Sequence, residues 1–401
     1  MVIRATSGLV GHDHNIDDAR AEGEGINNIM NTLSIPADFN NQYIHEKCTP
    51  RNNLVMLKTH KSGSSTLQNI ILRYAEKHNL SVVLPKEGHQ LGYPENFDLA
   101  DIIRAPWGQY NILTNHVRFS PDKSIMGMGF RSTQFFVATL VFCVALQGKF
   151  ESLFNYYRLG DVVRVRSLTD PLSTFLRSPH SYPRNYFTKN NYMYDLGFSE
   201  DDWNTPDKIR DIIRTVDKIF DFVFISEYFD ESLILLRHAM CWSIRDIAYF
   251  SVNVRHRSST RAVTPWMEQQ IKKWNVGDYQ LYRYFNKTFW QKVYKFGIKR
   301  MEKEKHDLQR EIQIYIERCI DDVTVNGKGI WHLDGVYINS YKLKPSARND
   351  VECIGMTKPE LTFTQELVSK QRRRNKEFRL QNNGTLGRPF SRITLNGELR
   401  Y

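Results

Sequence analysis

The chain has 401 residues and a formal net charge of +11. Hydrophobic residues make up 41% and charged residues 25%, which is the balance of a globular protein that can bury a sizeable core. The longest apolar run, residues 135–146, is shorter than the roughly 18–20 residues of a membrane span, so it indicates a buried strand. The positive charge favours anionic partners such as nucleic acid, acidic membranes, sulfated glycans or nucleotides, and charge alone does not choose among them.

The two ends of the chain differ in composition from its middle. Residues 1–47 predict a disordered leader, because this stretch is mostly polar and rich in Asp, Asn and Gly. It shows neither a basic n-region nor an apolar h-region, so no signal peptide is predicted. Near the other end, a basic run predicts a solvated, mobile tail. The run consists of Lys370, Arg372, Arg373, Arg374, Lys376 and Arg379.

The globular part is predicted to begin near Cys48 with a strand, a polar loop and a helix. Residues 53–58 form a short apolar run, NLVMLK, which is typical of a buried strand. A Ser- and Gly-rich turn follows it. Beyond the turn, apolar residues recur with the spacing of one helix face. These residues are Leu67, Ile70, Ile71 and Tyr74.

Strands and helices are then predicted to alternate. The further predicted strands cover residues 81–84, 110–114, 134–142 and 222–225. The further predicted helices cover residues 150–157, 206–220, 227–242 and about 278–317. This alternation is typical of an α/β fold with a mainly parallel sheet. From about residue 321 onward the pattern weakens.

The loop after the first strand has the composition of an anion site. A helix N-terminus presents N–H groups and the positive end of the helix dipole. Gly63 lets a ligand approach the backbone, hydroxyl side chains add donors, and Lys58 and Lys61 supply positive charge. The loop lacks the first glycine and the Gly-Lys pair of the nucleotide-binding pattern GxxxxGK[ST]. Composition alone leaves a phosphate-like anion site and an ordinary strand–helix turn as equal alternatives.

Two histidines follow predicted strands. His60 lies between the two lysines of the loop, and an imidazole suits the role of a general base near neutral pH. The alternative is a histidine that only hydrogen-bonds the backbone. His116 lies just after another predicted strand, and ligands gather at the carboxyl ends of strands in open α/β sheets.

Six segments in one order match a known family. They are Cys48-Thr49-Pro50 followed by LVMLKTHKSGSSTLQNI, then NHVRF from Asn115, KFESLFNYY from Lys149, DLGF from Asp195, FISEYFDESLILL from Phe224 and KWNVGDYQLYRYFNKTFWQKV from Lys273. Over about residues 48–325 the chain therefore resembles the galactose 3-O-sulfotransferases, a family that includes galactosylceramide sulfotransferase.

The resemblance implies a fold, a reaction and a location. The fold would be a P-loop-like three-layer sulfotransferase fold with a central, mainly parallel sheet, in a domain at residues 48–325 with a C-terminal extension at 326–401. The co-substrate would be 3′-phosphoadenosine 5′-phosphosulfate (PAPS), with no metal. The acceptor would be the 3-hydroxyl of a β-galactose on a galactosylceramide-like glycolipid or a glycan, and not nucleic acid. The enzyme would be a glycoprotein of the Golgi lumen or membrane that acts in carbohydrate sulfation and glycolipid biosynthesis.

The resemblance also assigns roles to residues. Lys61 would stabilise charge on the leaving phosphate, His60 would be the catalytic base, and His116 would be a further catalytic candidate that lines the acceptor side with Arg118. Ser152 would bind the 3′-phosphate. The loop residues that would hold the phosphosulfate are Lys58, Thr59, Lys61, Ser62, Gly63, Ser64, Ser65 and Thr66. A later cofactor-facing loop would contain Arg255, Arg257, Ser258 and Ser259.

Two features depart from the family pattern. The family's strand before the FES segment ends in Leu-Arg-Asp-Pro, and its arginine binds the 3′-phosphate, whereas residues 139–148 contain no arginine. Losing this contact costs about 1.5–3 kcal/mol, or about ten- to a hundredfold in affinity, unless a neighbour such as Arg158 substitutes. Family members also carry an N-terminal signal-anchor, which this sequence does not show.

The cysteines predict bridges in place of a metal site. No two of the five form a CxxC pair, so zinc is not expected. In the oxidising lumen that the resemblance implies, Cys48, Cys241, Cys319 and Cys353 could form disulfides. Cys143, inside the segment that departs from the family, is expected to be the odd one.

The sequence leaves three functions to compare. A PAPS-dependent sulfotransferase is preferred. The alternative is a catalytically weak or inactive protein of the same fold that binds acidic glycans. A nucleotide kinase or another P-loop enzyme is disfavoured, because the loop has no Walker lysine–serine pair.

Overall fold

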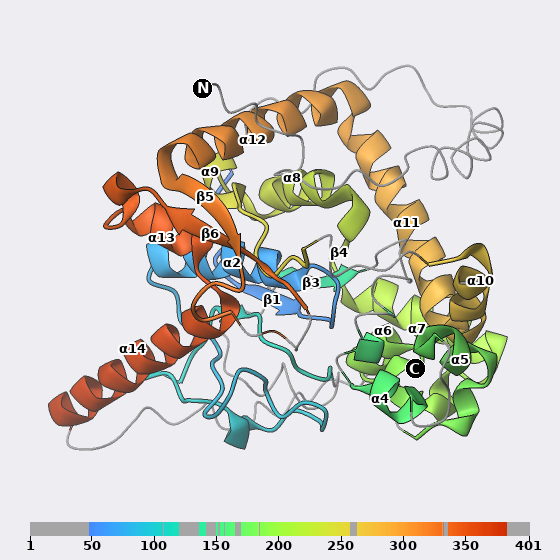
Figure 1. The fold of residues 1–401 in the computed structure, drawn as a ribbon. Coiled ribbons are helices and arrows are strands. Elements are labelled where there is room, and N and C mark those ends of the chain that lie inside the picture. Colours follow the sequence, from blue (N-terminus) through green and yellow to red (C-terminus); the bar gives the residue numbers. More distant parts are fainter. Residues whose placement is uncertain are drawn as a thin grey trace, which may run out of the picture. The chain divides into compact units, whose positions relative to one another are not determined.

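A four-stranded parallel sheet forms the centre of the fold (Figure 1). The strand order is β2-β1-β3-β4, and each neighbouring pair is parallel. The strands are β1 Leu54–Leu57, β2 Ile112–Leu113, β3 Phe136–Val141 and β4 Phe222–Ile225. Every residue of β1 and β4 is buried, as expected for parallel strands covered on both faces. The predicted α/β fold with a parallel sheet is confirmed.

The computed structural model describes most of the chain. The described residues are 48–106, 108–119, 136–141, 150, 153–155, 157–164, 170–183, 185–256, 263–330, 332 and 336–382. From Arg51 onward the chain forms one compact unit. The predicted leader, residues 1–47, lies outside the described residues.

Helices surround the sheet in the described part. The α-helices are α2 Ser64–Lys77, α4 Leu159–Arg164, α5 Pro171–Arg177, α6 Asn191–Asp195, α7 Pro206–Ile219, α8 Phe229–Met240, α9 Ile244–Ile247, α10 Pro265–Trp274, α11 Val276–Phe296, α12 Ile298–Cys319, α13 Val351–Thr357 and α14 Glu360–Gln381. Short 3₁₀ helices are η1 Leu99–Asp101, η2 Pro179–Ser181, η3 Asn185–Thr188, η4 Glu200–Asp202, η5 Ser226–Tyr228 and η7 Pro345–Ala347.

Most of the predicted strands are confirmed, and one is wrong. β1, β3 and β4 fall inside their predicted ranges, and β2 is shorter than predicted. Residues 81–84 do not form a strand, because only Val82 forms a bridge, to Ile112. Pro85 follows directly and bridges a different segment, antiparallel to Ile102, so no continuous ladder with β2 forms.

The helix predictions are also mostly confirmed. α7 and α8 match their predicted ranges within two residues. The predicted single helix at about residues 278–317 is wrong, because α11 and α12 are separate helices that meet at Gly297. Gly297 has φ 100° and ψ 118°, a conformation that ends a helix and that glycine adopts at little cost. Of the predicted helix at 150–157, residues 150 and 153–155 are helical and residues 151, 152 and 156 lie outside the described part.

The chain beyond residue 320 is more ordered than its sequence pattern suggests. β5 Ile320–Val325 and β6 Asn339–Leu343 form an antiparallel pair. The helices α13 and α14 then return to α2, and α14 is the red helix at the lower left of Figure 1.

The predicted mobile tail is wrong for the basic run, which lies on α14. Within the run Gln371 and Asn375 are buried, and Phe363 and Leu367 are buried earlier on the same helix. Arg372 donates to the carbonyl of Lys86 at 2.8 Å. The helix is therefore docked by its buried face, while several of its basic side chains remain exposed.

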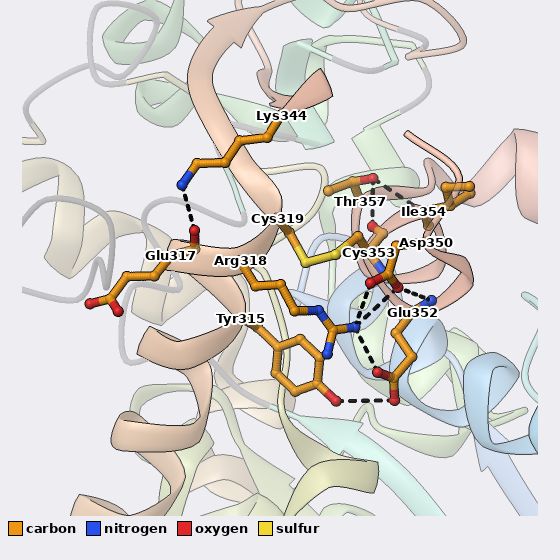
Figure 2. The surroundings of a disulfide bond; sticks show 10 residues. All are labelled: Tyr315, Glu317, Arg318, Cys319, Lys344, Asp350, Glu352, Cys353, Ile354 and Thr357. Carbon is orange, nitrogen blue, oxygen red and sulfur yellow. Dashed lines mark hydrogen bonds and ion pairs between the residues drawn. A yellow bond between two sulfur atoms is a disulfide. The ribbon is translucent and has the colours of Figure 1, made fainter. Parts of the chain in front are cut away.

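A disulfide between Cys319 and Cys353 joins the end of α12 to α13 (Figure 2). The bridge spans 34 residues, and closing a loop of this length stabilises a fold by about 3–4 kcal/mol in the chain-entropy view. Arg318 beside it pairs with Glu352 at 2.7 Å. Cys48 and Cys241 are also disulfide-bonded, so the prediction that these four cysteines form bridges is confirmed. The segment around residue 143 lies outside the described part.

Candidate active site

The loop between β1 and α2 lies at the carboxyl end of β1, and Gly63 is the N-cap residue of α2. Lys61 (φ 55°) and Gly63 (φ 77°) both adopt left-handed backbone conformations, which turn the chain sharply. A Cβ atom at Gly63 would meet nothing within 4 Å, so the backbone angle alone favours glycine there. The turn directs the first N–H groups of α2, which no helix can pair internally, toward the loop.

The hydroxyl side chains of the loop bond to the protein itself. Ser62 and Ser64 donate to the carbonyl of Thr59 at 3.2 and 2.9 Å. The Thr66 hydroxyl accepts a hydrogen bond from the backbone N–H of Val252 at 3.2 Å. These bonds hold the shape of the loop, and they leave backbone N–H groups and the Lys61 ammonium as the main means of binding an anion.

Lys61 brings positive charge to the loop. Its side chain is exposed to solvent, yet the protein around its ammonium desolvates it, and the charge of Lys58 repels it. With a smaller repulsion from Arg255, and despite the opposing attraction of Glu360, the pKa of Lys61 falls to about 8. The ammonium therefore remains mostly charged at neutral pH.

Lys58 is buried beneath the loop, with 1% of its surface exposed. Its ammonium forms an ion pair with Glu360 of α14. Burial lowers the pKa of Lys58, and the carboxylate of Glu360 opposes that shift. The second oxygen of Glu360 accepts a hydrogen bond from the Ser65 hydroxyl at 2.6 Å. Lys58 and Ser65, both predicted to hold a phosphosulfate, are therefore bound to the same carboxylate.

His60 is paired with Asp195, which is completely buried. The Nδ1 atom of His60 lies 3.2 Å from each carboxylate oxygen, and the backbone N–H of His60 donates to Asp195 Oδ2 at 2.9 Å. Because an ionised carboxylate only accepts hydrogen bonds, Nδ1 carries the proton and Nε2 presents its lone pair in the neutral ring. Among the described residues, Nε2 has no hydrogen-bond partner and is buried.

Two elements hold Asp195 in place. Asp195 is the last residue of α6, whose first amides, at Tyr192 and Met193, donate to the carboxylate of Asp278 at 3.0 and 3.1 Å. Asn190 in turn accepts hydrogen bonds from the first turn of α11. The two helices therefore cap each other, and α11 positions the carboxylate that orients His60.

Gly197 fixes the chain just after Asp195. Its φ is 94°, and a Cβ there would lie 2.0 Å from the carbonyl oxygen of Phe119. The Phe119 N–H also donates to the Asp195 carbonyl at 3.0 Å. Only glycine allows these two segments to approach so closely.

His116 stacks on His60, with ring centroids 4.0 Å apart and an interplanar angle of 16°. Its Nδ1 lies 2.9 Å from the carbonyl of Lys58, so Nδ1 is the donor and Nε2 the acceptor of the neutral ring. Burial lowers the pKa of His116 well below its usual range, and the charges of His60 and Lys58 add to the shift. His116 is therefore neutral near pH 7, and it lacks the carboxylate that would help it take up a proton.

Arg118 packs against the segment that follows Asp195. Its guanidinium lies 3.4 Å from the carbonyls of Gly197 and Phe198 and 4.3 Å from the ring centroid of Tyr194. Both predicted acceptor-side residues thus lie near the His60–Asp195 pair. His116 stacks on His60, and Arg118 contacts the segment that follows Asp195.

Comparison with known proteins identifies the chain. The galactose-3-O-sulfotransferase family model matches residues 27–371. The chain belongs to this family. It is 33% identical to the galactosylceramide sulfotransferase of Mus musculus over 341 residues, which are 80% of this chain and 79% of the relative. It is 34% identical to the galactose-3-O-sulfotransferase 2 of Sus scrofa over 355 residues, 80% of this chain and 85% of the relative.

Some residues that family resemblance singles out lie outside the described residues. These are Ser152, Arg257, Ser258 and Ser259, together with positions 142–148 of the segment without the family arginine. Two further candidates are described. Arg255 is close enough to lower the pKa of Lys61, whereas Arg158 lies 3.8 Å from Asp161 on the surface.

Two residues at the site of this sulfotransferase were not predicted. Asp195 stands in the DLGF segment, one of the six segments that resemble the family, but the resemblance gave Asp195 no role. Glu360 lies 302 positions beyond its partner Lys58, in a region whose pattern gave no signal. Asp195 could have been suggested by its place in a matched segment, but Glu360 could not.

Two features are absent from the described residues, a metal-binding cluster and a membrane-spanning helix. No group of three or more His, Cys, Asp or Glu side chains that could hold a metal ion occurs in the part of the chain that the structure describes. Among the described helices, none is both long enough and apolar enough to cross a membrane.

Proposed function

We propose that this sulfotransferase transfers a sulfuryl group from PAPS to the 3-hydroxyl of a β-galactose on a glycolipid or glycan. The observation that carries the proposal is the His60–Asp195 pair, with the buried and unpartnered Nε2 of His60, next to a basic loop at the N-terminus of a helix. The names of the relatives support a galactose-containing acceptor, and family membership supports PAPS as the donor.

The residues fit the two needs of the reaction. His60 Nε2 removes the proton of the acceptor hydroxyl as its oxygen bonds to sulfur and the bond from sulfur to the phosphate oxygen breaks. Asp195 stabilises the imidazolium that forms, as a carboxylate does for a histidine base in hydrolases. Lys61 and the first N–H groups of α2 stabilise the charge that develops on the leaving phosphate. His116, held neutral, accepts a hydrogen bond from the acceptor sugar.

The remaining assignments belong to the same proposal. The loop from Lys58 to Thr66 binds the 5′-phosphosulfate, Ser152 binds the 3′-phosphate, and Arg118 supports the acceptor side. Within the loop, Lys61 faces the donor, whereas Lys58 and Ser65 act through their contacts with Glu360. The enzyme acts in the Golgi lumen, associated with the membrane.

The acceptor assignment is tested with matched substrates. Purified protein and PAPS are incubated with galactosylceramide, with a soluble β-galactoside and with its 3-deoxy analogue. We expect sulfate on O3 of the first two, located by NMR, and none on the analogue. Sulfate at another position, or equal sulfation of the 3-deoxy sugar, would contradict the acceptor assignment.

Lys61 makes donor binding depend on pH. Bound phosphates raise its pKa above the value of about 8 in the unliganded protein, so binding takes up a proton above pH 8. We expect the Kd for the desulfated donor to be unaffected by this group below pH 8. Above pH 8 it should rise by up to tenfold per pH unit. Calorimetry from pH 7 to 10 measures this.

The control for this pH dependence is Lys61→Arg. An arginine stays charged across the whole range, so the rise in Kd above pH 8 should disappear while binding persists. A variant that keeps the same rise would show that another group titrates.

A further inference from the structure

The carboxylate of Glu360 links α14 to the loop between β1 and α2, which contains His60. Glu360 is the first residue of α14, and it is largely buried, with 12% of its side chain exposed. One oxygen pairs with the ammonium of Lys58, and the other accepts from Ser65 Oγ at 2.6 Å. Ser65 also accepts from the amide of Asn253 at 3.3 Å. One side chain thus joins the end of β1 to the first turn of α2, and Ser65 extends the link to the segment after α9.

The surrounding structure holds Glu360 at this position. Asn69 of α2 donates to the carbonyls of Gly355 and Lys358, at 2.9 and 3.2 Å, just before α14 begins. The disulfide of Cys353 with Cys319, drawn in Figure 2, anchors the same segment to α12. The segment that carries Glu360 is therefore fixed at two points within seven residues of it.

We propose that Glu360 is a positioning residue of the donor site, which fixes the loop by keeping Lys58 charged and Ser65 oriented. This proposal rests on the sulfotransferase function proposed above. A buried ammonium without an anion tends to lose its proton, and a buried hydroxyl without a partner tends to turn. Because Lys58 and Ser65 stand at the two ends of the loop, a single carboxylate that binds both sets the distance between those ends.

The charges around the pair decide what its loss would do. Lys61 of the loop, His116 after β2 and His89 interact electrostatically with the pair. His60 and Arg255 interact in turn with these neighbours. Without Glu360 these surroundings offer Lys58 no counter-ion, so the pKa of Lys58 falls further. The carboxylate that joins Lys58 to Ser65 is also lost, so the loop is held less firmly and donor binding weakens.

The test compares two replacements of Glu360 with one control replacement on the same helix. Glu360→Gln keeps an acceptor for Ser65 and removes the charge, and Glu360→Asp keeps the charge. Glu366→Gln is the matched control, since Glu366 is half-exposed and pairs only with Lys358 among the described residues. Calorimetry measures the Kd for the desulfated donor from pH 6 to 8, and steady-state rates give KM for donor and acceptor separately.

We expect Glu360→Gln to raise the donor Kd and KM by about ten- to a hundredfold, the cost of one charge-assisted hydrogen bond, with the acceptor KM unchanged. Relative to the wild-type protein, any rise of its donor Kd with pH should begin at a lower pH, because removal of Glu360 lowers the pKa of Lys58. Glu360→Asp should restore the wild-type pH profile, and Glu366→Gln should match the wild type throughout.

Unchanged donor binding in Glu360→Gln overturns the proposal. Tighter donor binding also overturns it, because it would mean that the carboxylate competes with the donor. Equal losses for donor and acceptor, with a lower unfolding temperature, would overturn it in favour of a general structural role. If the wild-type protein itself binds no donor, the sulfotransferase proposal fails first.

Discussion

Replacement of His60 by alanine is expected to lower kcat by about 10²- to 10⁴-fold, the usual contribution of a general base. His60 is the described imidazole near the loop that has a carboxylate on Nδ1 and an unpartnered Nε2. Donor affinity should change little, because the donor is held by the loop backbone and Lys61. Rates under saturating donor and acceptor, together with calorimetry of the desulfated donor, separate the two effects.

His306→Ala is the control for this replacement. His306 is exposed on α12, far along the chain from the loop, and its loss should leave kcat unchanged. If His60→Ala kept more than a tenth of wild-type activity, the base would have to be another group, and His116 would be the first to examine.

Asp195→Asn is expected to lower kcat by a similar factor, about 10²- to 10⁴-fold, because His60 then adopts the wrong tautomer. The side chain of asparagine has one carbonyl oxygen, which accepts, and one NH2 group, which donates. If its oxygen accepts from the His60 backbone N–H, as Oδ2 does now at 2.9 Å, its NH2 group faces Nδ1. Nδ1 must then accept, the proton moves to Nε2, and the base is lost although the ring stays in place.

The matched control is Asp202→Asn, a change of the same chemistry seven residues away. Asp202 is exposed and caps a short turn through Ser199. Its replacement should therefore change only the stability of the protein and leave kcat unaltered. A full-activity Asp195→Asn enzyme would show that the carboxylate does not set the state of His60. The donor Kd of Asp195→Asn should stay near the wild-type value.

Local pattern was enough to predict the parts of the site that are contiguous in sequence. The strand, the turn at Gly63 and the helix that follows it lie within 24 residues (54–77) and depend on apolar spacing and backbone freedom. The loop's lysines and His60 were therefore visible, and so was His116 after β2. The resemblance to the family supplied their roles, which the spacing alone left open.

The partners of these residues could not be predicted, because they come from distant parts of the chain. Asp195 reaches His60 across 135 positions, and Glu360 reaches Lys58 across 302. No periodicity encodes such contacts. They depend on how α6 is capped by α11 and how α14 is anchored to α2. The helix break at Gly297 was not predicted either, because the helical pattern continues on both sides of this residue.

The segment at residues 139–148 bears on the alternative function. It lacks the arginine that the family places before its FES segment, so donor affinity is expected to be lower than in relatives that carry it. A protein that had lost donor binding would still keep a basic loop able to hold acidic glycans. The presence of an oriented histidine base with a buried carboxylate favours the enzyme, because glycan binding alone does not require that pair.

Transfer of labelled sulfate from PAPS to a β-galactoside tests the central claim most directly. The assay uses the full chain at saturating donor, with Asp195→Asn beside the wild type. We expect wild-type transfer that depends on the galactoside and falls at least a hundredfold in the variant. Binding of the desulfated donor or of acidic glycans without any sulfate transfer by the wild type would contradict the account.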